Sequence, residues 1–182
     1  SCYGLTLHVP DVPVPEQPAV DLPEVRFYPE DLFADAAANM GDEVTIAIAH
    51  GLNVDAVDSG GNTALLLAAK FGAVSALRAL LHAGATVDTA NARGATPLYC
   101  AAKYGQDECL STLLKAGASK ESSIYSSRLT PYLVAVKYGR TKCASLLAEA
   151  GSDITVCDAR GRDAALLAEL FSNTEPEDGK YE

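Results

Sequence analysis

A repeat of 33 residues constrains the fold of this chain more than any other feature. Three sets of residues share the period: threonines that precede an apolar run, glycines nine residues after each threonine, and glycines that close each unit. In that order they are Thr63, Thr96 and Thr130; Gly72, Gly105 and Gly139; and Gly51, Gly84, Gly117 and Gly151. A period of this length predicts similar units stacked side by side, each packing on its neighbours.

Each unit is predicted to contain two short helices. Threonine before an apolar run is a typical N-cap, and the prolines that follow it at Pro97 and Pro131 suit the first position of a helix. The first helix runs to a Lys-aromatic-Gly stop, where glycine can take a left-handed backbone. A second helix follows, with leucines at helical spacing, and closes at the next glycine.

The turn between units carries the sequence features of a known family. Polar stretches with a central glycine link the second helix to the next threonine, and residues 96–101 read TPLYCA, close to the ankyrin signature T-P-L-H-x-A. The chain therefore resembles the ankyrin-repeat family over roughly residues 31–173. The resemblance implies an all-α solenoid of helix-turn-helix units with β-hairpin-like turns, with three full repeats between two partial capping repeats.

These patterns divide the chain into three regions. They are a proline-rich extended N-terminal segment (1–30), an ankyrin-repeat domain (31–173) and an acidic tail (174–182). The domain comprises an N-terminal partial repeat (31–57), full repeats at 58–90, 91–124 and 125–157, and a C-terminal partial repeat (158–173). Val44 follows Gly41 by three residues where later repeats leave five, which predicts a shorter turn between the first two helices.

The N-terminal segment holds six of the nine prolines, spaced by apolar residues. Proline at this density excludes helix and favours extended chain. Two interpretations stay open: a disordered leader, or an extended segment that docks on this protein or on a neighbour.

The turn of the third repeat departs from its neighbours. It has one extra residue, and Arg128 stands where the other turns have glycine, so its hairpin is not expected to match their geometry. Such a change is often drift on a tolerant loop. The functional alternative is a specific partner contact made by Ile124, Tyr125 and Arg128.

The sequence offers no group of residues suited to catalysis or to binding a cofactor or metal. The three histidines have no acid or cysteine at ligand spacing, and no phosphate-binding or nucleophile motif occurs. Five cysteines without a Cys-x-x-Cys pair favour a reducing intracellular compartment, either the cytoplasm or an organelle reached with a transit peptide that is then removed. No apolar run is long enough for direct membrane insertion.

Charge is distributed unevenly along the chain. The formal net charge is −10, yet residues 70–162 carry +5, while residues 1–69 carry −10 and residues 163–182 carry −5. The overall acidity opposes a general affinity for nucleic acid. The repeats themselves are basic, which favours an acidic partner.

The resemblance implies a concave face formed by the turn tips and the ends of the first helices. The candidate partner-binding residues there, with those of the third turn, are Lys70, Phe71, Arg93, Lys103, Tyr104, Tyr125, Arg128, Lys137, Tyr138, Arg160 and Arg162. Stacking would place the Lys-aromatic pairs in two parallel columns suited to a protein segment with carboxylates and aromatic or apolar groups. Alternatively, the aromatics only cover helix junctions and the lysines face solvent.

The sequence thus predicts a non-catalytic protein-protein interaction module. Either it is a stoichiometric accessory or scaffold subunit of a larger assembly, or it is a free adaptor with a transient partner. An enzyme with an unrecognised site and a nucleic-acid binder are weaker alternatives. A further hypothesis is that the acidic leader or tail lies across the concave face and competes with the partner.

Overall fold

The computed structural model describes residues 28–122, 124 and 127–171, and the predicted leader and acidic tail lie outside them except for residues 28–30. Within this part the chain forms nine α-helices and no extended strand, which confirms the predicted all-α class. The helices are α1 Pro29–Ala37, α2 Gly41–Ala49, α3 Ala64–Phe71, α4 Val74–His82, α5 Pro97–Tyr104, α6 Asp107–Lys115, α7 Pro131–Lys137, α8 Thr141–Glu149 and α9 Ala164–Phe171.

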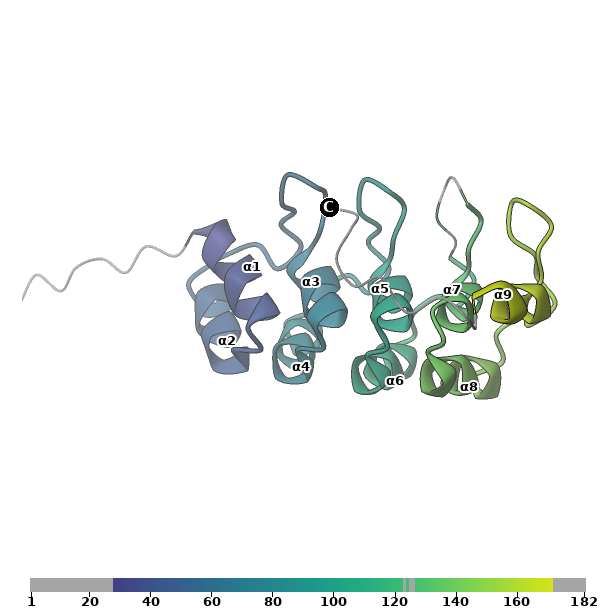
Figure 1. Cartoon of the computed structure of the whole chain (residues 1–182). Coiled ribbons are helices and arrows are strands. Elements are labelled where there is room, and N and C mark those ends of the chain that lie inside the picture. Colours follow the sequence, from purple (N-terminus) through teal and green to yellow (C-terminus); the bar gives the residue numbers. More distant parts are fainter. Residues whose placement is uncertain (1–27, 123, 125–126, 172–182) are drawn as a thin grey trace, which may run out of the picture.

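The helices form two rows, with the hairpin loops as a third (Figure 1). The first helices of the repeats, α1, α3, α5, α7 and α9, pack in series, and α2, α4, α6 and α8 form a parallel row beneath them. The loops between repeats project beyond the first row on the side away from the second. The molecule is therefore a repeat solenoid, as the period predicts.

Buried threonines set where the first helices begin. The hydroxyl oxygens of Thr63, Thr96 and Thr130 each accept a hydrogen bond from the backbone N–H three residues ahead, at 3.2, 3.3 and 3.3 Å. Gly72 and Gly105 then end α3 and α5 with positive φ. These caps confirm the start and stop signals read from the sequence.

The first unit corrects the prediction of a shorter turn. Asn39, with φ of 63°, takes the left-handed position that Gly72 holds one repeat later, so the spacing to the buried Val44 is the usual five residues. Gly41 instead allows close packing between repeats, because a Cβ at this position would lie 2.5 Å from the Ser75 hydroxyl oxygen. The helix also begins at Pro29, inside the segment predicted to be extended, because proline suits the first helical position.

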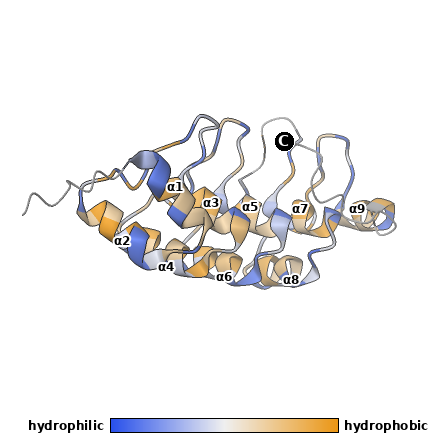
Figure 2. Ribbon diagram, turned by 60° about the vertical axis from the view of Figure 1, so that its left-hand side comes forward, coloured by the Kyte–Doolittle hydropathy of each residue, from blue (hydrophilic) through white to orange (hydrophobic). Residues whose placement is uncertain are grey.

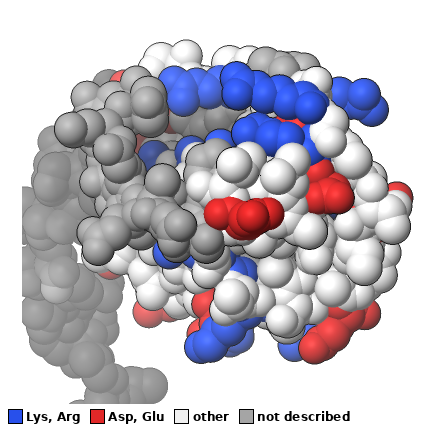
Figure 3. All heavy atoms as spheres, turned by 45° about the vertical axis from the view of Figure 1, so that its right-hand side comes forward, with Lys and Arg blue, Asp and Glu red and all other residues white. Residues whose placement is uncertain are grey.

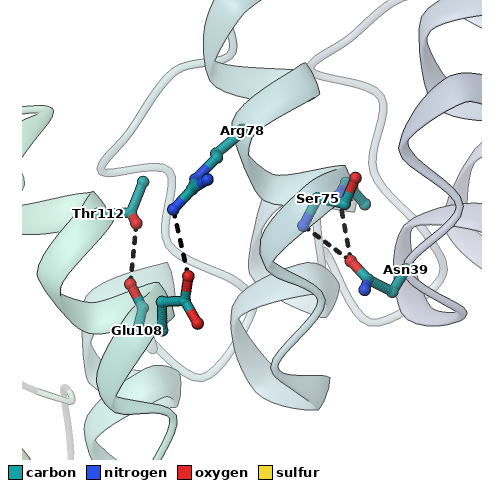
Figure 4. A network of polar contacts seen from close by, with 6 residues as sticks. Asn39, Ser75, Arg78, Glu108 and Thr112 are labelled. Atoms are coloured by element: carbon teal, nitrogen blue, oxygen red, sulfur yellow. Dashed lines mark hydrogen bonds and ion pairs between the residues drawn. The ribbon is translucent and has the colours of Figure 1, made fainter.

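Asn39 also joins the first unit to the second. Its side-chain oxygen accepts hydrogen bonds from the backbone N–H groups of Ser75 and Ala76 at 2.8 and 3.3 Å, at the start of α4 (Figure 4). Farther along the same row, Arg78 of α4 pairs with Glu108 of α6 at 3.2 Å. Both side chains of that pair are well exposed, so it adds little stability.

A leucine-rich core runs the length of the solenoid. Hydrophobic residues gather in the helices, while the loops are largely hydrophilic (Figure 2). The largest fully buried side chains are Leu32, Val44, Leu65, Leu66, Leu77, Leu80, Leu98, Leu110, Leu113, Leu133, Leu147 and Leu167. Buried alanines between them let neighbouring helices approach closely. Among the described helices, none is long and apolar enough to cross a membrane.

The third hairpin differs from the others as its extra residue predicts, but only in part. Its backbone closes with the Ile124 N–H bonded to the Leu129 carbonyl, one residue farther than in the other hairpins. Arg128 nevertheless has φ of 50°, so it adopts the left-handed backbone of the glycine it replaces. The prediction that this turn cannot match its neighbours is therefore wrong at Arg128.

Candidate functional site

Lysines and aromatic rings interleave along the ends of the first helices. The Lys70 ammonium lies 5.0 Å from the Phe71 ring centre and 5.7 Å from that of Tyr104 in the next repeat. Lys103 repeats the arrangement with Tyr104 at 5.3 Å and with the following repeat's tyrosine at 5.7 Å. All these distances lie within the range of cation-π attraction.

One more pair completes this Lys-aromatic ladder. Lys137 lies 5.3 Å from the ring centre of Tyr138. The predicted pair of separate columns is thus one interleaved column, in which each of the first two lysines contacts rings of two repeats. This Lys-aromatic ladder consists of Lys70, Phe71, Lys103, Tyr104, Lys137 and Tyr138.

The next repeat along the chain fixes the helix ends that carry the ladder. Gln106 donates a hydrogen bond to the Lys70 carbonyl at 3.4 Å, and Arg140 donates one to the Lys103 carbonyl at 3.3 Å. These two residues occupy equivalent positions in consecutive repeats. The ladder therefore stands on backbone that its neighbours hold in place.

The ladder is partly exposed and partly desolvated. Phe71 is 54% exposed and Tyr104 38%, whereas the lysines are half-buried. Burial, together with neighbouring positive charge, lowers the pKa of Lys103 and of Lys137. Among the described residues, no carboxylate lies within ion-pair distance of Lys70 or Lys103, whose ammonium groups lie over aromatic rings instead.

A hollow of about 680 Å³ opens beside the ladder, between the first two hairpins and helices α3 and α5. Its rim includes Lys70, Lys103 and Arg93. Its walls and the loops around it are formed by Gly60, Asn62, Leu66, Asn91, Ala92, Ala95, Tyr99, Cys100, Tyr104 and Ile124. Among the described residues that line it there are three cations and no aspartate or glutamate, so this part of the described surface is positively charged.

A smaller hollow of about 270 Å³ lies between the third and fourth hairpins. Lys137, Arg160 and Arg162 line it together with Asp158. A hydrogen bond from the Arg162 guanidinium at 2.8 Å lowers the pKa of the Asp158 carboxyl to about 2. That carboxylate is already paired with Arg162 within its own hairpin, and Lys137 and Arg160 add two further cations to the lining of this hollow.

Basic side chains form a continuous row along the upper edge of the molecule in Figure 3. Most of the predicted site residues belong to the ladder or line one of the two hollows. Arg128 is exposed and lines neither hollow, and Tyr125 lies outside the described residues.

Sequence reasoning missed the inner wall of the larger hollow. Leu66, Tyr99 and Cys100 are at most 6% exposed and were expected only as core. Burial raises the pKa of the Cys100 thiol to about 11, which keeps it protonated and unreactive at neutral pH. One feature of the sequence could have indicated this wall: Tyr99 stands where the family signature has histidine, so a larger ring with a hydroxyl group occupies that position.

The described residues hold no group of three or more histidine, cysteine or acidic side chains that could bind a metal ion. Of the cysteines in this part, Cys100, Cys109 and Cys143 are buried, as expected of small apolar side chains, and Cys157 is exposed. What converges on the concave face is positive charge and aromatic surface, which suits recognition.

Comparison with known families gives two matches. A family model for ankyrin repeats in three copies matches residues 87–158, and a second for ankyrin repeats in many copies matches residues 34–81. A search of curated proteins finds no match. The two models together cover most of the helical units. The chain therefore belongs to the ankyrin-repeat family, whose repeats form protein-protein interaction modules.

Proposed function

We propose that this protein is a non-catalytic binding module whose concave face takes up an acidic, partly aromatic segment of another protein. The Lys-aromatic ladder carries the proposal, because Lys70 and Lys103 are half-buried cations with no carboxylate partner among the described residues. A bound carboxylate would provide that partner, and the exposed rings of Phe71 and Tyr104 would contribute apolar contact area.

The electrostatics of the repeats support the same ligand. Residues 70–162 carry a formal charge of +5, and both hollows present lysine and arginine on the hairpin side. Complementary charge raises the association rate and weakens with salt. Binding is expected to be strongest at low ionic strength.

We propose further that the protein acts as a stoichiometric accessory or scaffold subunit of a larger assembly in a reducing intracellular compartment. The apolar, proline-rich sequence of residues 1–30 supports this role, since such a segment is suited to lying across neighbouring subunits. Isolation of the endogenous protein tests it: co-elution with fixed partners supports the proposal, and recovery as a free monomer favours a transient adaptor.

The binding face is tested with a triple alanine variant of Phe71, Tyr104 and Tyr138. With partners captured from the source cells, we expect at least a tenfold loss of affinity, because aromatic hot-spot residues typically contribute 1–2 kcal/mol or more each. The matched control replaces Met40, Ile46 and Ile154, which are 45, 44 and 52% exposed and lie off the ladder. Equal affinity of both folded variants would overturn the proposed face.

Competition by the acidic ends is tested separately. We propose that the leader or tail competes for the same face, since residues 1–27 and residues 172–182 each contain four acids and one base, a formal charge of −3. Deleting residues 172–182 or 1–27 should then raise partner affinity and steepen its salt dependence. Unchanged affinity in both deletions would reject the competition and leave the binding face itself untouched.

A further inference from the structure

We propose that the larger hollow is a pocket for one tyrosine side chain of the bound segment, with glutamate or aspartate residues on either side of that tyrosine. The inference rests on the proposed function and adds the residue that anchors the partner. Three features of the hollow lead to it: a largely apolar inner wall, one hydroxyl group on that wall and a basic rim.

The wall is apolar and rigid. Leu66 is 2% exposed, Ala95 7% and Cys100 6%, and all three line the hollow. Ile124, from the third hairpin, adds a half-buried aliphatic side chain. Leu66 and Cys100 stand on helices and are held by core packing, so an entering ring would meet a preformed surface.

The Tyr99 hydroxyl is the polar group of the inner wall, while Asn62 and Asn91 line the hollow from the hairpin loops and hydrogen-bond to each other at 2.8 Å. Tyr99 as a whole is only 5% exposed, and no hydrogen bond joins its hydroxyl to another described residue. The hydroxyl is not among the fully buried polar atoms, which is consistent with its opening toward the hollow that Tyr99 lines. Burial raises its pKa well above the usual value, so the group stays a neutral O–H that can donate and accept. A ligand that fills the hollow must satisfy this hydroxyl or leave it buried without a partner.

Tyrosine fits these constraints better than other side chains. Leucine or phenylalanine would match the apolar wall but would leave the Tyr99 hydroxyl unpaired, at a cost of about 1–3 kcal/mol. Glutamate could accept from the hydroxyl, but its charge would be desolvated against Leu66 and Ile124. A phenol places an apolar ring on the wall and a hydroxyl within reach of Tyr99.

The rim selects the residues beside the anchor. Lys70 and Lys103 border the hollow on the ladder side, and Arg93 borders it on the second hairpin. With the tyrosine inserted, the flanking residues of the segment lie over these cations. Carboxylates on both sides of the tyrosine therefore complete the match.

The probe is the synthetic peptide Glu-Glu-Tyr-Glu-Glu, titrated into the full chain by calorimetry, beside its phenylalanine and alanine analogues. We expect the tyrosine peptide to bind threefold or more tightly than the phenylalanine peptide. In the Tyr99→Phe variant this preference should disappear, because the protein no longer has the hydroxyl group with which the tyrosine of the peptide would form a hydrogen bond. A preference of the same size in wild type and Tyr99→Phe, or no preference in either, overturns the pocket.

A matched pair of filling variants tests the location. Ala92 lines the hollow and is exposed, and Ala159 is its counterpart in the fourth hairpin. Each donates a backbone hydrogen bond to the preceding hairpin, at 3.2 and 2.9 Å. Ala92→Phe should lower the affinity for the tyrosine peptide at least fivefold, and Ala159→Phe should change that affinity less than twofold.

The outcomes separate the two proposals. Equal weakening by Ala92→Phe and Ala159→Phe overturns the pocket and points to diffuse charge attraction. If the ladder triple variant still loses its natural partner in that case, the proposed function stands without the pocket. Retained partner binding in the ladder variant rejects the proposed function, whatever the peptide does.

Discussion

Ile124 of the third hairpin cannot form the side-chain brace that the equivalent residue forms in each of the other three hairpins. In each of those, one Asx oxygen accepts hydrogen bonds from the backbone N–H groups two and four residues ahead. The distances are 2.8 and 2.8 Å for Asp58, 3.0 and 3.0 Å for Asn91, and 2.8 and 3.0 Å for Asp158. The equivalent residue of the third hairpin is Ile124, which has no side-chain acceptor.

Ile124 leaves the third hairpin without this stabilising contact, but its side chain contributes to the wall of the larger hollow. Without the brace, the third hairpin closes through a 3.4 Å bond from the Ile124 N–H to the Leu129 carbonyl, across one additional residue. Its glycine position holds Arg128 in a left-handed backbone. In return, the Ile124 side chain lines the larger hollow. Ile124 therefore contributes to the hollow at some cost to the stability of its own loop.

The largest effect is expected when the brace of the fourth hairpin is removed. Asp158→Ala eliminates two backbone hydrogen bonds and the Arg162 pair from a buried site, which should lower the free energy of unfolding by about 2 kcal/mol. Chemical denaturation at pH 7 measures it. Asp158→Asn should cost less, because Asn91 makes the same backbone contacts with an amide. An Ala variant as stable as wild type would contradict the role of the brace.

Acid should weaken the fourth hairpin by about 1–2 kcal/mol through the same group. The pKa of Asp158 is about 2 in the folded chain against 3.8 ordinarily, so its contribution is complete above pH 4 to 5 and is lost as pH falls toward 2. The stability gap between wild type and Asp158→Asn should therefore shrink over this interval. A gap that does not change between pH 6 and pH 2 would exclude ionised Asp158 as its source.

Exchanging glycine and arginine at the left-handed position of the third and fourth hairpins should change the free energy of unfolding in opposite directions, by smaller amounts. Gly161 has φ of 72° and no atom within 4 Å of an added Cβ, so Gly161→Arg tests backbone strain alone and should cost about 1 kcal/mol. Arg128→Gly should gain about 0.5 kcal/mol, because relief of strain exceeds the entropy lost by glycine. Thermal or denaturant unfolding gives both signs. If both variants were stabilised, or both destabilised, backbone strain at Arg128 would be excluded as a difference between the two hairpins.

The period and caps made most of the fold predictable, since threonine N-caps and left-handed glycines act locally. The prediction failed at Asn39 and Arg128, where a residue other than glycine takes a positive φ. Intrinsic preference assigns that conformation to glycine, and only the packing of neighbouring repeats shows the exception. The ladder was predictable from recurring Lys-aromatic pairs. The hollow was not, because it joins Leu66 and Tyr99, on helices of two repeats, with Ile124 of the third hairpin and depends on how these elements pack.

The smallest expected effect decides why the third hairpin keeps a strained arginine. Arg128 is an exposed cation near the basic face, so Arg128→Gly should lower affinity for the natural acidic partner about two- to threefold at low salt, and Arg128→Lys should not. Raising the salt should erase the difference. Higher stability together with weaker binding would mean that the strain is retained for recognition. Higher stability with unchanged binding would assign the third turn to drift on a tolerant loop.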